Sequence, residues 1–256
     1  MNNRVKIEEN NIYLYNLYKA ANTLWYFNDL IKGGFSGYNS VKFKNEASVY
    51  VWLENVQIKD DNYFGVLAEN GDSYKIPFKE VIDWMIIDNG RLLGGYTIRH
   101  YRDTLDSNSK TKFDLDFGVD IDDGNDLFKP DFTTPEGAII RIENFYSQEN
   151  LEGVLSCKNF MQEAENLVRD SEVNLNEELK IEIAQKLEAL FIEDIKLNGF
   201  PYFDDIERNF TLKYQLHDRR LIEEKIIYSD GSVTYNNIWV GYANDTWKVL
   251  NTADES

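Results

Sequence analysis

The first hydrophobic pattern in the chain has a period of three to four residues and covers positions 12–31. That spacing places apolar side chains on one face of a helix, and Gly33-Gly34 marks where the helix should end. The apolar positions are Leu14, Leu17, Tyr18, Ala21, Leu24, Trp25 and Phe27. The pattern therefore predicts an amphipathic helix near the start of the sequence.

From residue 48 the period changes to two, which is typical of a strand with one buried face. Along 48–57, one side carries Val49, Val51 and Leu53, and the other carries Tyr50, Trp52 and Glu54. Shorter strands are expected around 63–67, 74–78 and 92–99. The first half of the chain is therefore predicted to be one helix with a strongly bent antiparallel sheet or small barrel.

Residues 82–99, IDWMIIDNGRLLGGYTIR, form a predicted hairpin. Asn89-Gly90 separates two apolar segments, and both residues accept positive φ at little cost. On this prediction Asp83 and Arg99 lie on neighbouring strands and form a partly buried ion pair, with Trp84 and Tyr96 packed beside it. The pair either fixes the register of the hairpin, which we favour, or belongs to a binding site.

In the second half, helices are predicted first and strands after them. Thr134-Pro135-Glu136 supplies an N-cap, a first-turn proline and an acidic residue near the positive end of the helix dipole. Further helices are expected from 151 or 158 to 168 and from 176 to 197. Beyond Gly199-Phe200-Pro201 the period returns to two, with turns at 229–232 and 244–245, which predicts an antiparallel meander. The fold class is therefore α+β.

An acidic segment separates the two halves, with six Asp among residues 113–126. Its spacing does not fit a calcium-binding loop, because Val119 or Phe113 would occupy the first ligand position. We predict an acidic linker at 113–130 between a domain at 1–112 and a domain at 131–256. An irregular cation site in the linker is left open.

Several short motifs resemble known families. Asp83-Trp84-Met85 and Gly94-Gly95-Tyr96-Thr97-Ile98-Arg99, with the aromatic segments before them, resemble the bacterial domain of unknown function 2314 over residues 13–105. No catalytic residues follow from that resemblance. The order of elements over 131–251, with PEGAI opening the first helix, resembles the nuclear-transport-factor-2-like family, which implies a cone of helices and curved sheet with a pocket at its wide end.

The charge of the chain is unevenly distributed. The net charge is −18, but residues 1–112 carry 14 Lys and Arg against 14 Asp and Glu, whereas residues 113–256 carry 13 against 31. An acidic surface repels nucleic acid and attracts a basic protein, although solubility alone also accounts for it. The apolar runs are too short for a membrane span, and the single cysteine, Cys157, fits a reducing compartment. We therefore expect a cytoplasmic protein, and homodimerisation is left open.

The inventory of catalytic side chains is small. The chain has two histidines, His100 and His217, and neither has a metal-type partner at a suitable spacing. Phosphate-binding loops, nucleophile elbows and dinucleotide fingerprints are missing from the sequence. We therefore name no catalytic residue, metal or cofactor, and a role as an enzyme is disfavoured without being decided.

These observations lead to one function and one alternative. The first is a non-enzymatic binding protein of bacterial conflict systems, an immunity-type protein that neutralises a basic toxin; the resemblances imply that context. The alternative is a small-molecule-binding protein, hydrolase or isomerase that uses the pocket of the second domain. The candidate binding residues are Asp83, Trp84, Tyr96, Arg99, Tyr214, His217 and Trp239.

Overall fold

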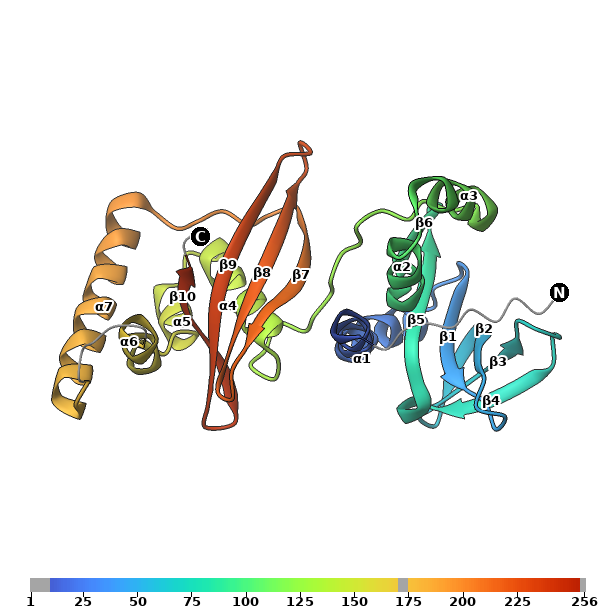
Figure 1. Cartoon of the computed structure of the whole chain (residues 1–256), viewed down its shortest axis with the longest axis horizontal. Helices are drawn as coiled ribbons and strands as arrows, with labels where there is room; N and C mark the ends of the chain where they lie inside the picture. Colours follow the sequence, from blue (N-terminus) through green and yellow to red (C-terminus); the bar gives the residue numbers. More distant parts are fainter. Residues whose placement is uncertain (1–9, 170–174, 254–256) are drawn as a thin grey trace. The chain divides into compact units, whose positions relative to one another are not determined.

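The computed structural model describes residues 10–169 and 175–253, which fall into two compact units, Met1–Lys129 and Pro130–Ser256 (Figure 1). Each unit combines helices with an antiparallel sheet. The α+β fold class predicted from the sequence is therefore confirmed. No helix in the described part of the chain is long and apolar enough to cross a membrane.

The first unit is built on an open sheet of six antiparallel strands, in the order β4-β3-β2-β1-β5-β6. Because β4 and β6 are edges, the described strands form an open sheet, and the alternative of a small barrel is wrong. The elements are α1 (Asn11–Lys32), β1 (Asn39–Lys44), β2 (Tyr50–Lys59), β3 (Asn62–Leu67), β4 (Ser73–Pro77), the 3-10 turn η1 (Phe78–Glu80), β5 (Val81–Asp88), β6 (Arg91–Gly94), α2 (Tyr96–Asp103) and α3 (Ser107–Phe117).

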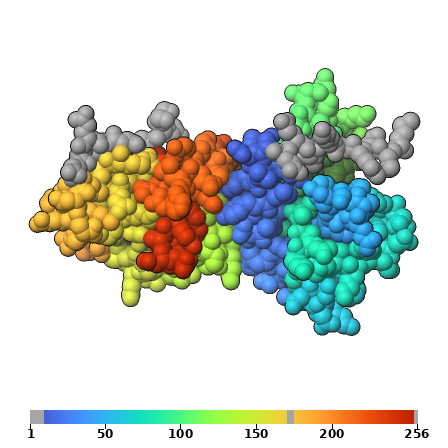
Figure 2. Space-filling model, turned by 60° about the horizontal axis from the view of Figure 1, so that its bottom comes forward, coloured from blue at the N-terminus to red at the C-terminus, as the bar shows by residue number. Residues whose placement is uncertain are grey.

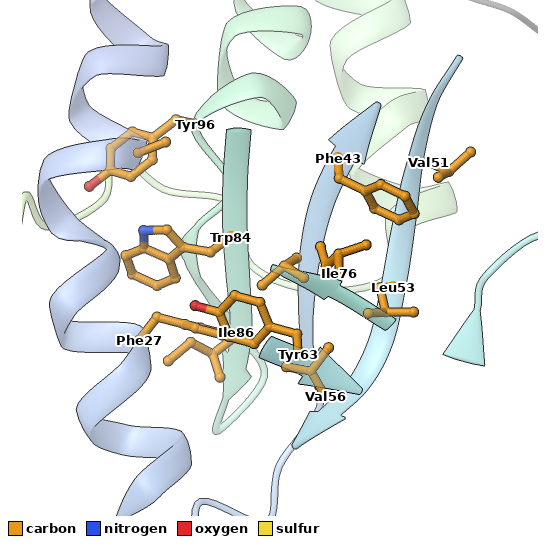
Figure 3. Close-up of a cluster of buried hydrophobic side chains, with 12 residues drawn as sticks. Phe27, Phe43, Val51, Leu53, Val56, Tyr63, Ile76, Trp84, Ile86 and Tyr96 are labelled. Atoms are coloured by element: carbon orange, nitrogen blue, oxygen red, sulfur yellow. The ribbon is translucent and has the colours of Figure 1, made fainter. Parts of the chain in front are cut away.

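One face of this sheet packs on α1 and forms the main core. Asn10 caps α1 by accepting a hydrogen bond from the backbone N–H of Tyr13. Figure 3 shows Phe27 and Trp84 between α1 and β5, with ring centroids 5.6 Å apart. The indole N–H of Trp84 donates to the hydroxyl of Thr23 at 3.1 Å, so its polar atom is satisfied within the core. The predicted helix and the predicted alternation of β2 are both confirmed.

The hairpin between β5 and β6 turns at Asn89 and Gly90, whose φ angles are 49° and 81°, as the sequence predicted. The prediction of a strand over 92–99 is wrong after Gly94. Gly94 and Gly95 adopt φ angles of 67° and 65°, and this left-handed pair ends the strand and begins α2. A side chain at Gly94 would also collide with the Trp84 ring, since a Cβ there would lie 2.6 Å from a ring carbon.

The predicted acidic linker is part of the first unit. Residues 113–117 belong to α3, and residues 118–128 run back over the unit as a segment that we call the strap. Ile121 and Phe128 are buried, and the strap backbone pairs with the hairpin through Leu92 N–H to Asp120 O and Asp120 N–H to Gly90 O. The acidic composition predicts a solvated linker, because the buried residues Ile121 and Phe128 are too far apart in the sequence to give a helix or strand pattern.

The described residues of the second unit form four helices followed by a four-stranded meander in the order β10-β9-β8-β7. Thr134 caps the first helix by accepting from Gly137 N–H, as predicted. The segment expected to be one short helix is two helices, and α7 packs mainly on α6 (Figure 1). The elements are α4 (Pro135–Ser147), α5 (Leu151–Ser156), α6 (Phe160–Val168), α7 (Glu177–Asn198), β7 (Ile206–Gln215), β8 (Arg219–Tyr228), β9 (Val233–Ala243) and β10 (Thr246–Ala253).

Candidate functional site

A pocket of about 380 Å³ lies on the face of the first sheet that points away from α1. It follows from the alternation of the strands. Val51 and Leu53 join the core, so Trp52 and Glu54 point to the opposite face. Helices α2 and α3 complete the walls. The lining residues are Tyr38, Lys42, Trp52, Glu54, Ala68, Met85, Thr97, Ile98, Tyr101, Phe113 and Phe117.

Three polar side chains are connected at one end of this pocket. The Lys42 ammonium donates to the Thr97 hydroxyl at 3.0 Å, and that hydroxyl donates to Asp83 Oδ2 at 2.6 Å. Lys42 and Thr97 line the pocket, whereas Asp83 lies behind them and is fully buried. The Thr97 hydroxyl therefore links an accessible cation to a buried carboxylate.

The charges of Lys42 and Asp83 are held in a partly dehydrated setting. Burial lowers the pKa of Lys42, while the nearby Asp83 charge opposes that shift. Burial raises the pKa of Asp83, and hydrogen bonds from Thr97 and Trp84 oppose the rise. The Lys42 ammonium also lies 5.6 Å from the centroids of the Tyr50 and Trp52 rings. Aromatic faces and a carboxylate thus hold this cation at the pocket edge.

Aromatic rings make up much of the remaining lining, and two of them, Phe113 and Phe117, come from α3. Phe113 and Phe117 stack with centroids 5.7 Å apart, and Tyr101 meets Phe113 edge-on at 5.6 Å. A bidentate pair between Arg102 and Asp114, at 2.6 and 2.7 Å, attaches α3 to α2. Helix α3 has no fully buried residue. It therefore covers the pocket with partly exposed rings, a surface suited to a flat apolar molecule.

Asp83, a predicted binding residue, is a helix cap. Its two carboxylate oxygens accept hydrogen bonds from the backbone N–H groups of Trp84, Tyr96 and Thr97 as well as from the Thr97 hydroxyl. Tyr96 and Thr97 are the first residues of α2, whose N-terminal N–H groups have no partner inside the helix. A carboxylate from β5 therefore caps α2, and its charge faces the positive end of the helix.

The predicted ion pair between Asp83 and Arg99 is wrong, because Arg99 lies on α2 and not on a strand. Its guanidinium donates to Leu92 O at 2.6 Å and to Gly94 O at 3.0 Å, and it contacts both the backbone and the side chain of Asp122. Arg99 thus joins the hairpin to the strap. Trp84 and Tyr96 are core residues, and they meet nearly perpendicular at 6.2 Å.

The three candidates in the second unit lie at one end of its sheet. Tyr214 and Trp239 meet edge-on at 6.1 Å, and the guanidinium of Arg169 lies 4.8 Å above the Trp239 ring. His217 is exposed in the turn between β7 and β8. The structure therefore brings Tyr214 and Trp239 into contact and places His217 in the exposed turn.

A buried charged cluster in the second unit was missed from the sequence. Arg208 lies 2.9 Å from a Glu143 oxygen and 3.4 Å from a Glu224 oxygen, and both glutamates are buried. Burial, and then the charge of Glu224, raises the pKa of Glu143. The sequence does contain one indication of this cluster, because Glu224 lies between Ile222 and Ile226 on the otherwise apolar face of β8.

Lys42 was the other omission, since a lysine between Val41 and Phe43 looks like an ordinary solvent-facing position. Within the described residues, no group of three His, Cys, Asp or Glu side chains is arranged to hold a metal ion. The first unit is therefore an α+β module with a polar-ended aromatic pocket.

Residues 31–121 match a family described as an uncharacterized protein conserved in bacteria, the domain of unknown function 2314. The match supports the resemblance inferred for the first half of the chain. It spans β1 to α3 and the start of the strap, and it contains every residue that lines the pocket.

Two further likenesses cover part of the chain. A provisionally named ankyrin repeat protein of Neisseria meningitidis serogroup B is 26% identical over 123 residues, which are 44% of this chain and 44% of that protein. The chain therefore matches less than half the length of that relative. A solved structure, provisionally named an NTF2-like transpeptidase of Campylobacter jejuni, covers 46% of this chain and 98% of its own, with 16% identity and a TM-score of 0.27.

Proposed function

We propose that the protein is a binding protein whose first unit recognises a flat aromatic molecule bearing an anionic or strongly accepting group. The observation that carries this proposal is the pocket of about 380 Å³, in which an ammonium group lies at one end of an aromatic chamber. Small-molecule sites are mostly apolar with a few placed polar groups, which is the composition found here.

Lys42 supplies the polar recognition in this proposal. Its ammonium already donates to Thr97, and an ammonium has three donors, so a ligand acceptor can take another. The rings of Trp52, Tyr101 and Phe117 offer faces for stacking. Glu54, which accepts from the Tyr38 hydroxyl at 2.8 Å, gives the pocket a second charged wall that disfavours ligands with two acidic ends.

A matched pair of dyes tests the proposal. The probes are 8-anilinonaphthalene-1-sulfonate and N-phenyl-1-naphthylamine, which share the same ring system but differ in the sulfonate. We expect the sulfonate to bind the full chain with a Kd on the order of 10–100 μM, as expected for a ligand of that size. The measurement is dye fluorescence against protein concentration.

Variants separate the pocket from nonspecific dye binding. Lys42→Met should weaken the sulfonate about tenfold or more while leaving the neutral dye unchanged, since it removes one charge-assisted hydrogen bond. Lys44→Met, on the same strand and also stacked on Tyr50 but outside the pocket, should change neither. Equal losses in both lysine variants would refute the assignment.

A second candidate function is the immunity-type role, which the charge of the second unit favours. Residues 130–256 contain 12 Lys and Arg against 25 Asp and Glu. Such a surface speeds association with a basic protein, and the rate falls as salt rises. The test is co-purification with the product of an adjacent gene together with protection of growth. If no complex forms and growth is not protected, this role is excluded.

A further inference from the structure

A second pocket, of about 280 Å³, lies at the C-terminal end of α7 in the second unit. Its walls contain three aromatic rings and one carboxylate, and among the described residues that line it none is Lys or Arg. Its lining includes Tyr146, Phe191, Asp194, Asn198 and Phe200. This site is separate from the pocket of the first unit, which belongs to a different compact unit.

The aromatic walls come from three different parts of the unit. Tyr146 is on α4, Phe191 is on α7 and Phe200 follows α7, and the Tyr146 and Phe200 centroids are 6.4 Å apart. Burial raises the pKa of Tyr146, so its phenol stays neutral and its ring keeps an electron-rich face. A cation that lies over the face of such a ring, within about 6 Å of its centroid, is attracted by it.

Phe191 already packs against an ammonium from within the protein. The Lys158 nitrogen lies 5.2 Å from its centroid, and Lys158 is paired with Glu163 at 2.7 Å. Because Glu163 balances the charge of Lys158, this internal ammonium does not make the region positive. Phe191 thus already contacts one ammonium, that of Lys158, whose charge is compensated by Glu163.

Asp194 gives the pocket its charge, and α7 adds to it. Asn198 donates to Asp194 Oδ1 at 2.7 Å and so fixes the carboxylate within the last turn of the helix. The C-terminal end of a 22-residue helix carries the negative end of its dipole, which favours cations there. The carboxylate and the dipole both attract a positive group to the same place.

Two exposed leucines lie on α7 beside the pocket residue Asp194. Leu190 and Leu197 lie four residues before and three residues after Asp194 on the same side of α7, and they are 62% and 81% exposed. Helix α7 stands at the edge of the second unit, with a surface open to solvent (Figure 2). The two leucines therefore give this side of α7 apolar surface next to the Asp194 carboxylate.

We infer that this pocket receives a lysine side chain from a basic protein partner. The alkyl stem of the lysine would pack on the rings and on the exposed leucines, while its ammonium lies between the aromatic faces and Asp194. The inference rests on the second candidate function, a basic protein partner. It names the group that the partner presents and the place where that group binds.

The experiment uses the 15N-labelled full chain and two capped amino acids, N-acetyl-lysine methylamide and its uncharged isostere N-acetyl-norleucine methylamide. The lysine compound should shift backbone amides of residues 191–200 with a Kd on the order of 1–10 mM, which suits one cation in an aromatic and acidic pocket. The norleucine compound should bind at least fivefold more weakly. Equal binding of the two compounds would overturn the cation site.

Two variants and one competitor complete the design. Asp194→Asn keeps the carbonyl that Asn198 binds and should weaken lysine binding about fivefold or more, whereas Glu193→Gln, exposed on the same helix, should leave it within twofold. Butylammonium tests whether the cation comes from a protein or from a free amine. If it binds more tightly than the lysine compound, the occupant of the pocket is a free amine and the inference of a partner lysine is wrong. If lysine fails to bind while a basic partner still co-purifies, this site is refuted and the second candidate function stands.

Discussion

The carboxylate of Asp83 accepts hydrogen bonds from both the backbone N–H and the hydroxyl of Thr97, at 2.7 and 2.6 Å, next to the Gly94-Gly95 pair at which β6 ends and α2 begins. The same Thr97 hydroxyl accepts from Lys42. One buried acid thus starts a helix and positions a residue of the pocket. The start of α2 and the lining of the pocket therefore depend on the same contact.

Removing the Asp83 carboxylate should destabilise the protein strongly. Asp83→Ala leaves the N–H groups of Tyr96 and Thr97 buried without their acceptor, which costs roughly 3 kcal/mol or more of the free energy of unfolding. Urea denaturation measures the loss. Asp88→Ala, at the exposed end of the same strand, should cost less than about 0.5 kcal/mol. Similar losses in the two variants would contradict the capping role.

Arg99→Ala should release the strap from the hairpin. Its guanidinium donates to the backbone carbonyls of Leu92, Gly94 and Asp122 and contacts the Asp122 carboxylate, so the variant leaves three carbonyls and a carboxylate without that donor. We expect a loss of roughly 2–4 kcal/mol and faster hydrogen exchange at the N–H groups of Leu92 and Asp120. Lys110→Ala, which removes an exposed pair with Asp103, is the control. Unchanged exchange at Asp120 would show that the strap is held by its other contacts.

The buried Glu143 predicts a particular dependence of stability on pH. Its pKa is raised in the folded state, so the stabilisation by its protonated form is complete below the ordinary value of about 4.5 and is lost as pH rises through the folded pKa. Glu143→Gln keeps the neutral shape and should flatten that slope. Each unit of pKa shift corresponds to about 1.4 kcal/mol.

The measurement for Glu143 is urea denaturation from acid to alkaline pH. The variant should gain stability relative to the natural chain as pH rises, while Glu152→Gln, exposed on α5, should run parallel to the natural chain. A Glu143→Gln curve parallel to that of the natural chain would mean that Glu143 is ionised throughout.

Cys157 should be unreactive in the folded protein. Its side chain is fully buried, and burial raises the pKa of the thiol, so little thiolate is present and reagents cannot reach it. Reaction with 5,5′-dithiobis(2-nitrobenzoate) at mildly alkaline pH should be roughly 1000-fold slower than in urea, because it waits for opening of the unit. Rapid modification of the native chain would place the thiol at the surface.

Periodicity was sufficient for much of the fold. The apolar spacing of α1, the alternation of β2 and the cap at Thr134 are local properties, and each appears in the structure where the pattern placed it. Asn89-Gly90 also identified the turn of the hairpin, because left-handed backbone favours those two residue types.

The errors arose where a distant residue decides the local structure. Thr97 to Arg99 has the composition of a strand, yet Gly94-Gly95 and the carboxylate of Asp83 make it a helix. Lys42 reaches the pocket only because α2 and α3 fold over the sheet, and the sequence around it contains no trace of those contacts. The acidic strap likewise packs through Arg99 and Lys19, whose pairing partners are set by the tertiary fold.

The contacts between α1 and the end of the strap lie outside residues 31–121, the segment that matches the bacterial family. Lys19 on α1 binds Asp126 at 2.6 Å, and Trp25 donates to Leu127 O at 2.9 Å, so the two ends of the unit hold each other. A gene fusion that exchanged only residues 31–121 would transfer the strands and the pocket but not the contacts of Lys19 with Asp126 and of Trp25 with Leu127. A graft from α1 through Phe128 would keep both contacts, whereas a shorter graft would carry the pocket residues without them.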